Sequence, residues 1–326
     1  MQKISSHIIE RLKQFEKNLD PRFPERNGIP TKVLGYGEIS TVLAIETETK
    51  KEFAYKRLPM FKAEEEAVTY EALFREYNRV LKERIGLDMV PSATVRLKNK
   101  AKDYVTVYII QEKLPPDCIG HRVIHHITPE ETERLIRAVL KNMKKVFDFN
   151  REHENELEVA LDGQISNWGV VGFDAKRPRL HKDVELVFLD TSSPLMRKDG
   201  VEQLDSEWYL RAAPSFLVWI IRLLFVKDIL NRYYDFRKVV IDLVANFYKE
   251  QRHELIPDLV NTVNDFFRDE IEKGDFKPIS VTEVKSYYRE DAWIWRIYLT
   301  FRKIDRFLHR LIGKDYPYIL PANIKR

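Results

Sequence analysis

The stretch that decides the predicted fold is Leu161-Asp162-Gly163-Gln164-Ile165-Ser166-Asn167-Trp168. It follows a strongly predicted helix and precedes two strand-like runs, of which the second ends in Val187-Phe188-Leu189-Asp190. We expect Asp162, Asn167 and Asp190 to lie together at one mouth of the strand pair. One aspartate can orient an attacking hydroxyl and accept its proton, while the asparagine and the other aspartate can hold Mg²⁺. The Asp-x₄-Asn spacing is common by chance, but its position before Asp190 predicts a phosphoryl-transfer site.

The sequence around this stretch predicts mainly helices. Thr128-Pro129-Glu130-Glu131 is typical of a helix start, because Thr128 can cap, proline suits the first turn and Glu131 can complete a capping box. Apolar residues then recur at helical spacing through Phe147. The strand pair is expected at Gly169–Phe173 and Val184–Leu189, and later helices at 214–230, 235–250, 256–272 and 283–312.

The residues before position 115 follow another pattern. Apolar spacing predicts a helix over 2–18, which Asp20-Pro21 ends. One helix, 62–85, interrupts five short runs rich in β-branched and aromatic residues. These predicted strands are Lys32–Leu34, Thr41–Ile45, Glu52–Arg57, Ala93–Leu97 and Tyr104–Gln111.

These patterns predict an α+β fold with two lobes. Residues 1–30 form an N-terminal helical extension, and 31–114 form a small lobe with an antiparallel sheet and one main helix. Residues 115–326 form a larger helical lobe that contains the Asp162 loop and ends in a basic, aromatic helix.

Gly35-Tyr36-Gly37-Glu38-Ile39-Ser40-Thr41-Val42 lies between the first two predicted strands. Its two glycines allow backbone N–H groups to approach phosphate oxygens closely. A dinucleotide-binding fold would need a helix directly after this loop, but Thr41–Ile45 predicts a strand, so that fold is excluded. A glycine hairpin that binds nothing is the alternative.

Phe53-Ala54-Tyr55-Lys56 places a lysine on the third predicted strand. From there Lys56 can reach the α- and β-phosphates of a nucleotide, held by a carboxylate of the following helix. We prefer Glu76 as that carboxylate over Glu71, because Glu76 shares a helix face with apolar residues. An exposed surface glutamate is the alternative for both.

The order of these motifs resembles the protein-kinase-like superfamily, over a core from about residue 30 to 230. Gly35 and Gly37 match its glycine-rich loop, in which Ser40 replaces the third glycine, and Gln111 to Leu114 match its hinge. The resemblance implies that ATP is bound by Gly35, Gly37, Ser40, Val42, Ala54, Lys56, Glu76, Gln111, Glu112 and Leu114. It implies a catalytic set of Asp162, Lys56, Asn167 and Asp190, with Mg²⁺ held by Asn167 and Asp190.

Three departures move the resemblance away from regulated protein kinases. Ala160-Leu161 replaces their His-Arg pair, Gln164 replaces a lysine or histidine, and Thr191-Ser192 follows Asp190 in place of Phe-Gly. The chain is therefore more similar to small-molecule kinases of the aminoglycoside phosphotransferase and choline kinase type, or to an atypical branch. We expect an ATP- and Mg²⁺-dependent phosphotransferase with a hydroxyl-bearing small-molecule acceptor. A protein substrate stays open, and the alternative function is a pseudokinase that binds a nucleotide or serves as a scaffold.

Composition sets further bounds on the chain of 326 residues. Its single cysteine, Cys118, excludes an internal disulfide and a cysteine-based zinc site. The most apolar run, Phe216 to Val226, is far shorter than the roughly 20 residues of a membrane-spanning helix, and the N-terminus has no signal-peptide pattern. We expect a soluble, cytoplasmic protein.

The charge is uneven along the chain, because residues 281–326 carry ten Lys and Arg against five Asp and Glu. Such a basic, aromatic segment can meet an acidic partner or a phosphate surface. We prefer an amphipathic helix that buries its aromatic face, and we do not expect a nucleic-acid partner.

Overall fold

The computed structural model describes residues 4–47, 49, 51–98, 102–213, 218, 230–271 and 277–322. They form an α+β fold with a small antiparallel sheet and many helices. The strands are β1 (Thr31–Tyr36), β2 (Thr41–Ile45), β3 (Phe53–Phe61), β4 (Ser92–Lys98), β5 (Val105–Glu112), β6 (Leu157–Val159), β7 (Trp168–Val170), β8 (Leu186–Phe188), β9 (Met196–Lys198) and β10 (Val201–Glu202). The α-helices are α1 (Ser6–Asn18), α2 (Glu64–Arg79), α3 (Gly120–Val123), α4 (Pro129–Glu152), α5 (Ser206–Leu210), α8 (Phe236–Lys249), α9 (Ile256–Glu270) and α10 (Val281–Leu311).

The main sheet has five antiparallel strands in the order β1-β2-β3-β5-β4. The predicted order of three strands, one helix and two strands is confirmed. β3 runs past the predicted end at Arg57, because Leu58, Met60 and Phe61 continue the strand as a wholly buried run. A buried run of this kind has no alternation that would predict a strand.

The predicted strand pair is found as β7 and β8, although both strands are shorter than predicted. A three-stranded sheet of order β10-β9-β6 among the described residues, with no strand longer than three residues, was not predicted. A run of two or three residues is too short to show a strand period. The predicted helix over 214–230 lies mostly outside the described residues.

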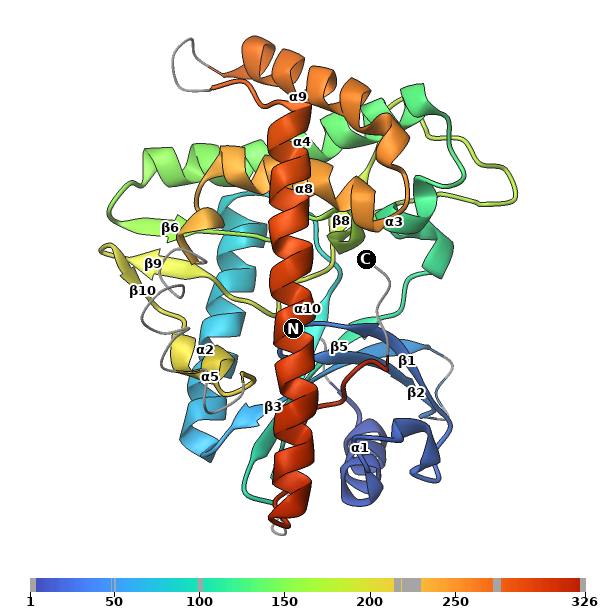
Figure 1. Ribbon diagram of the computed structural model, residues 1–326, viewed down its shortest axis with the longest axis vertical. Helices are drawn as coiled ribbons and strands as arrows, with labels where there is room; N and C mark the ends of the chain where they lie inside the picture. Colours follow the sequence, from blue (N-terminus) through green and yellow to red (C-terminus); the bar gives the residue numbers. More distant parts are fainter. Residues whose placement is uncertain are drawn as a thin grey trace.

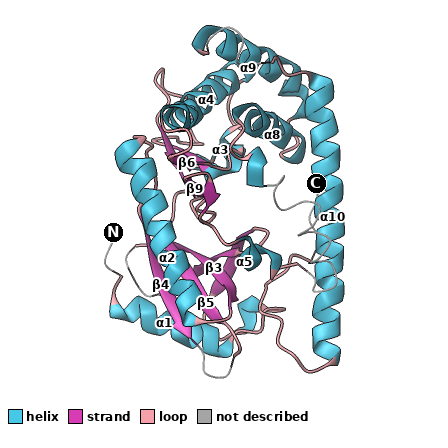
Figure 2. Ribbon diagram, turned by 90° about the vertical axis from the view of Figure 1, so that its left-hand side faces the viewer, coloured by secondary structure: helices cyan, strands magenta, loops and turns pink. Residues whose placement is uncertain are grey.

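The elements divide between the two ends of the molecule (Figure 1). The main sheet and α1 lie at one end, and α4, α8 and α9 lie at the other. Figure 2 shows α10 running along one side past both groups of elements. No helix among the described residues combines the length and hydropathy needed to cross a membrane.

The start of α4 forms as predicted. The Thr128 hydroxyl accepts a hydrogen bond from the backbone N–H of Glu131 at 3.2 Å, and the Glu131 carboxylate accepts one from the N–H of Thr128 at 3.2 Å. Such a reciprocal cap satisfies backbone donors that the first helical turn leaves free. The buried side chains of Leu135, Val139 and Met143 on α4 then pack into the main core.

A buried ion pair joins α1 to strand β3 of the main sheet. The Nε of Arg57 on β3 lies 2.5 Å from Oε1 of Glu16, and the Tyr108 hydroxyl donates to the same oxygen at 2.6 Å. Arg57 also donates to the carbonyl of Pro317 at 2.6 Å, so the segment after α10 packs against the sheet. Burial alone would raise the pKa of Glu16, but Arg57, Tyr108 and Lys102 together hold it below its usual value.

We expect Arg57→Met to lower the free energy of unfolding by about 3–5 kcal/mol, because it leaves the Glu16 carboxylate buried and unpaired. The lowered pKa of Glu16 means that its contribution is present above the unfolded-state pKa and is lost as pH falls through the folded-state pKa. Glu16→Gln should remove that part of the acid sensitivity. Urea unfolding at neutral and acidic pH measures both effects.

The matched control is Lys13→Gln, which breaks an exposed pair with Glu10 on α1 and should change stability by less than about 1 kcal/mol. An Arg57→Met variant as stable as the parent would contradict the assignment.

Candidate active site

Lys56 and Asp190 meet between the main sheet and the end of β8. The Nζ of Lys56 lies 2.6 Å from Oδ1 of Asp190, although the residues are 134 positions apart. The two side chains are 15% and 30% exposed, so water only partly screens the pair. This is the convergence that the sequence predicted.

The hydrogen bonds around Asp190 keep it ionised. The backbone N–H and the hydroxyl of Ser192 donate to Oδ1 at 3.0 and 2.7 Å. Burial would raise the pKa of Asp190, but Lys56 and Ser192 hold it below its ordinary value. Among the described residues no hydrogen-bond donor is recorded on Oδ2, which leaves that oxygen available to a cation.

The Asp162 loop lies beside this pair. The Asn167 side-chain amide donates to the Asp162 carbonyl at 3.1 Å, and the N–H of Gln164 donates to Oδ1 of Asp162 at 3.1 Å. The N–H of Leu189 donates to the Asn167 carbonyl at 2.8 Å, which places Asn167 next to the residue that precedes Asp190. The structure therefore brings Asp162, Asn167 and Asp190 into one neighbourhood.

Two tyrosines of α2 hold the backbone on both sides of this neighbourhood. Tyr77 donates to the carbonyl of Ala160 at 2.6 Å, and Tyr70 donates to that of Ser192 at 2.8 Å. Both tyrosines are fully buried. The helix thus fixes the approach to Asp162 and the exit from Asp190 at the same time.

Gly163 sets the distance between the loop and the helices behind it. A Cβ at Gly163 would lie 2.8 Å from a methyl of Val239 on α8 and 2.9 Å from the end of Met143 on α4. A side chain at position 163 would have to displace the Val239 methyl and the end of Met143, so the loop packs closely on α8 and α4.

Asp242 is the acidic residue that the sequence analysis missed. Its carboxylate accepts a hydrogen bond from the Gln164 side chain at 3.2 Å, and Lys249 donates to the other end of that side chain at 3.4 Å. Burial, the charge of Asp242 and that of Asp190 raise the pKa of Asp162 above its ordinary value. A single aspartate inside the apolar run Val239–Ala245 is the signal that could have revealed it.

Lys249 places a positive charge next to Gln164, one of the departures from the protein-kinase-like pattern. Gln164 stands where the protein-kinase-like pattern has a positive charge, and Lys249 at the end of α8 brings an ammonium group to that glutamine. The same lysine lowers the pKa of Asp162 and so opposes the effect of Asp242. The positive charge missing from the loop is thus present on α8.

The glycine-containing hairpin joins β1 to β2 at the edge of the sheet. In the register, Gly35 lies opposite Val42, and Val42 lies opposite Lys56. The N–H of Gly37 donates to the Ser40 carbonyl at 2.9 Å, and a Cβ at Gly37 would lie only 2.7 Å from the Ser40 hydroxyl. The tight turn therefore requires glycine at position 37, whether or not it binds phosphate.

The predicted hinge contacts the site at its first residue. The Gln111 side chain donates to the Leu189 carbonyl at 2.8 Å, directly before Asp190, and Ala54 lies opposite Gln111 in the β3–β5 register. Gln111 thereby links the end of β5 to the end of β8.

Glu112 and Leu114, the two other hinge residues expected to contact ATP, lie in different surroundings. Glu112 forms an ion pair with Lys51 at 3.0 Å and is exposed. Leu114 packs against β7, where a Cβ at Gly169 would lie 2.7 Å from its methyl group.

The pairing predicted between Lys56 and a glutamate of α2 is not found. Glu76 accepts a hydrogen bond from Lys198 of β9 at 2.8 Å, and Glu71 pairs with Arg96 of β4 at 2.5 Å. Lys56 is held by Asp190 instead. The sequence did not predict the pairing of Glu76 with Lys198, because the three-residue strand β9, which carries Lys198, was not recognised.

The site offers oxygen donors of the kind that Mg²⁺ prefers. In the part of the chain that the structure describes, no three Asp, Glu, His or Cys side chains form a ready-made metal cluster. Mg²⁺ is usually bound by one or two carboxylates together with phosphates and water. Oδ2 of Asp190 and the side-chain oxygen of Asn167 fit that donor set.

The chain belongs to a family of unknown function, DUF6206, which matches residues 18–306. A solved structure described as "WaaP in complex with acyl carrier protein" is 15% identical, with a TM-score of 0.32, over 78% of this chain and 99% of that one. No curated protein matches this sequence.

We expect Asp242→Asn to lower the pKa of Asp162, because it removes the nearby negative charge that favours the protonated form. The change is measured by carboxyl ¹³C NMR across a pH titration. Asp183→Asn, in an exposed loop, serves as the control and should leave the pKa of Asp162 unchanged. An unchanged Asp162 titration in Asp242→Asn would show that the two carboxylates do not interact.

Proposed function

We propose that this protein is a kinase-like phosphotransferase that uses ATP and Mg²⁺ to phosphorylate a hydroxyl-bearing small molecule. The observation that carries the proposal is the Lys56–Asp190 contact at 2.6 Å, with Asn167 beside it. A lysine and a carboxylate from distant elements are brought together there, in surroundings that lower the pKa of Asp190. Phosphoryl transfer needs such positioned charges more than it needs covalent chemistry.

Each group has a role that follows from its surroundings. Lys56 and the N–H groups of the Gly35–Val42 hairpin would bind the phosphates, and Gln111 to Leu114 would lie beside the base. Asn167 and Asp190 would hold Mg²⁺, which supplies neutralising charge between phosphate oxygens. When the nucleotide binds, Lys56 would leave the Asp190 carboxylate and contact the phosphates.

Asp162 would orient the acceptor hydroxyl and receive its proton. A general base works best when its pKa lies near the working pH. Burial and Asp242 raise the pKa of Asp162 toward that range, so this carboxylate is a better base than an exposed aspartate. Lys249, which reaches Gln164, would offset negative charge as the phosphoryl group moves.

A pseudokinase is the second candidate function. The observation that favours it is that Glu76 pairs with Lys198. The resemblance to protein-kinase-like enzymes implied a pairing of Glu76 with Lys56. Retention of Lys56, Asp162, Asn167 and Asp190 favours the enzyme.

Asp190→Ala should abolish the Mg²⁺-dependent part of ATP binding, because it removes a metal ligand. Asp162→Ala should keep that binding and lower the rate of phosphoryl transfer by about 10²–10³-fold, the usual effect of deleting one transition-state contact. Thermal shift with ATP, with and without Mg²⁺, measures binding. Release of labelled phosphate to water or to a panel of hydroxyl compounds measures transfer.

Asp183→Ala is the control, because Asp183 is exposed and lies before β8, outside the Asp162 and Asp190 segments. Metal-dependent ATP binding without transfer to any acceptor or water would favour the pseudokinase. Binding that survives Asp190→Ala unchanged would refute the assigned site.

A further inference from the structure

The outward side of α10 carries an exposed apolar stripe, which we define as Trp293, Ile304, Phe307, Leu308 and Leu311. Trp293, Phe307 and Leu311 are 64%, 58% and 66% exposed. The positions 304, 307, 308 and 311 follow the spacing that places residues on one helix face. In Figure 1, α10 crosses in front of the other elements along its length.

The sequence analysis preferred a helix that buries its aromatic face, and this is only partly correct. Trp295 is buried against the protein, whereas Trp293, two positions earlier, faces outward. The buried side of the distal half is formed by Arg302 and Asp305. The exposed stripe is therefore additional to the face that anchors the helix.

A row of cations runs beside the stripe. Arg289, Arg296, Lys303 and Arg310 are spaced by seven residues, so they lie near one line along α10, and Arg306 lies within the same side. We call these five residues the basic row. Helices that lie flat on a lipid surface combine Trp, Phe and Leu with flanking Lys and Arg in this way.

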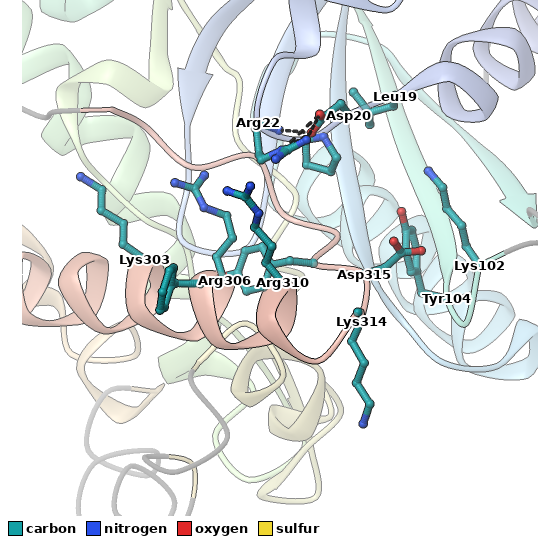
Figure 3. Close-up of a pocket in the computed structure, with 14 residues that line it drawn as sticks. Leu19, Asp20, Arg22, Lys102, Tyr104, Lys303, Arg306, Arg310, Lys314 and Asp315 are labelled. Carbon is teal, nitrogen blue, oxygen red and sulfur yellow. Dashed lines mark hydrogen bonds and ion pairs between the residues drawn. The ribbon is translucent and has the colours of Figure 1, made fainter.

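Three residues of the basic row, Lys303, Arg306 and Arg310, also line a cleft of about 750 Å³ between α10 and the segment after α1 (Figure 3). In the figure, Arg306 and Arg310 extend from α10 toward Arg22. Phe307 of the stripe lines the same cleft. Cationic and apolar groups thus open onto one surface.

The charges in this cleft are only partly compensated. Asp20 is taken by Arg22 at 2.6 Å, and Lys303 donates to the Ala322 carbonyl at 2.6 Å. Among the described residues, no side-chain hydrogen bond or ion pair holds the guanidinium groups of Arg306 and Arg310, although the charge of Arg306 acts on Asp20, which Arg22 already binds. Two neighbouring guanidinium groups of this kind can bind an anion.

A second copy of this chain complements the surface poorly. Of the four acids on α10, Asp305 is buried and Glu283 is paired with Arg237, which leaves Glu290 as the exposed acid of this helix against the five cations of the basic row. Antiparallel contact between two copies would place one basic row against the other. Like charges facing each other oppose that contact.

We propose that α10 binds this protein to the surface of an anionic membrane. The stripe enters the boundary between headgroups and acyl chains, with Trp293 at interfacial depth, while the basic row lies on lipid phosphates. The cleft beside Arg306 and Arg310 receives a headgroup phosphate. The proposal is independent of the phosphotransferase assignment, because no residue of the stripe or the row belongs to that site.

The test is sedimentation of the full chain with vesicles of phosphatidylcholine alone, and of phosphatidylcholine with one quarter phosphatidylglycerol. We expect binding to the anionic vesicles only, weakened by salt. Arg306→Gln/Arg310→Gln should weaken it by about fivefold for each charge removed. Phe307→Ser/Leu311→Ser should weaken it by at least about tenfold, because two partly inserted side chains are lost.

Lys141→Gln/Lys182→Gln, which removes two exposed cations elsewhere, is the matched control and should bind like the parent. Circular dichroism and thermal unfolding of all variants report that the rest of the molecule is intact. No vesicle binding at low salt, or equal loss in the control, would overturn the proposal. So would a dimer in solution that Phe307→Ser/Leu311→Ser dissociates, or binding to an acidic peptide but not to vesicles.

Discussion

The contact between Lys56 and Asp190 is the constraint on which the arrangement of this protein depends. It joins the middle strand of the main sheet to the β7–β8 pair, and neither charge has an equivalent partner if the two separate. A partly buried charge that loses its partner is strongly destabilising. The two ends of the molecule are therefore held in one relative position at the place where the chemistry is proposed.

Other contacts converge on the same few residues. Gln111 binds the carbonyl before Asp190, and Tyr70 binds the carbonyl of Ser192 after it. Tyr77 fixes the backbone that leads to Asp162. Because these contacts arise from both β5 and α2, a shift of either element would move the carboxylates. Such convergence is what a site needs when positioning supplies most of the rate.

The balance of charge around Asp162 explains why the site suits a cationic or phosphate-bearing ligand. Asp162, Asp190 and Asp242 bring three carboxylates into one region, and the cations that act on them are Lys56, Lys249 and Arg232. Burial, followed by the charges of Asp242 and Asp190, raises the pKa of Asp162. A divalent cation would favour the ionised carboxylates, and a nucleotide phosphate would then take Lys56.

Local signals in the sequence predicted much of the fold, and long-range pairing limited the rest. The capping box at Thr128 and the order of strands and helix along the small lobe were predictable from motif and spacing, and the resemblance implied that Lys56 and Asp190 belong to one site. The partner of Glu76 was not, because Lys198 lies on a three-residue strand. Asp242 was overlooked because an apolar helix conceals a single carboxylate, and the side on which Trp293 faces depends on the packing of α10.

The most direct test is an NMR titration with ATP and Mn²⁺, which replaces Mg²⁺ and broadens signals close to it. The account predicts that the side-chain amide of Asn167 and the backbone amides around Asp190 broaden first, and only when nucleotide and metal are both present. Broadening confined to residues outside the Asp162 and Asp190 segments, or absent altogether, would contradict the account.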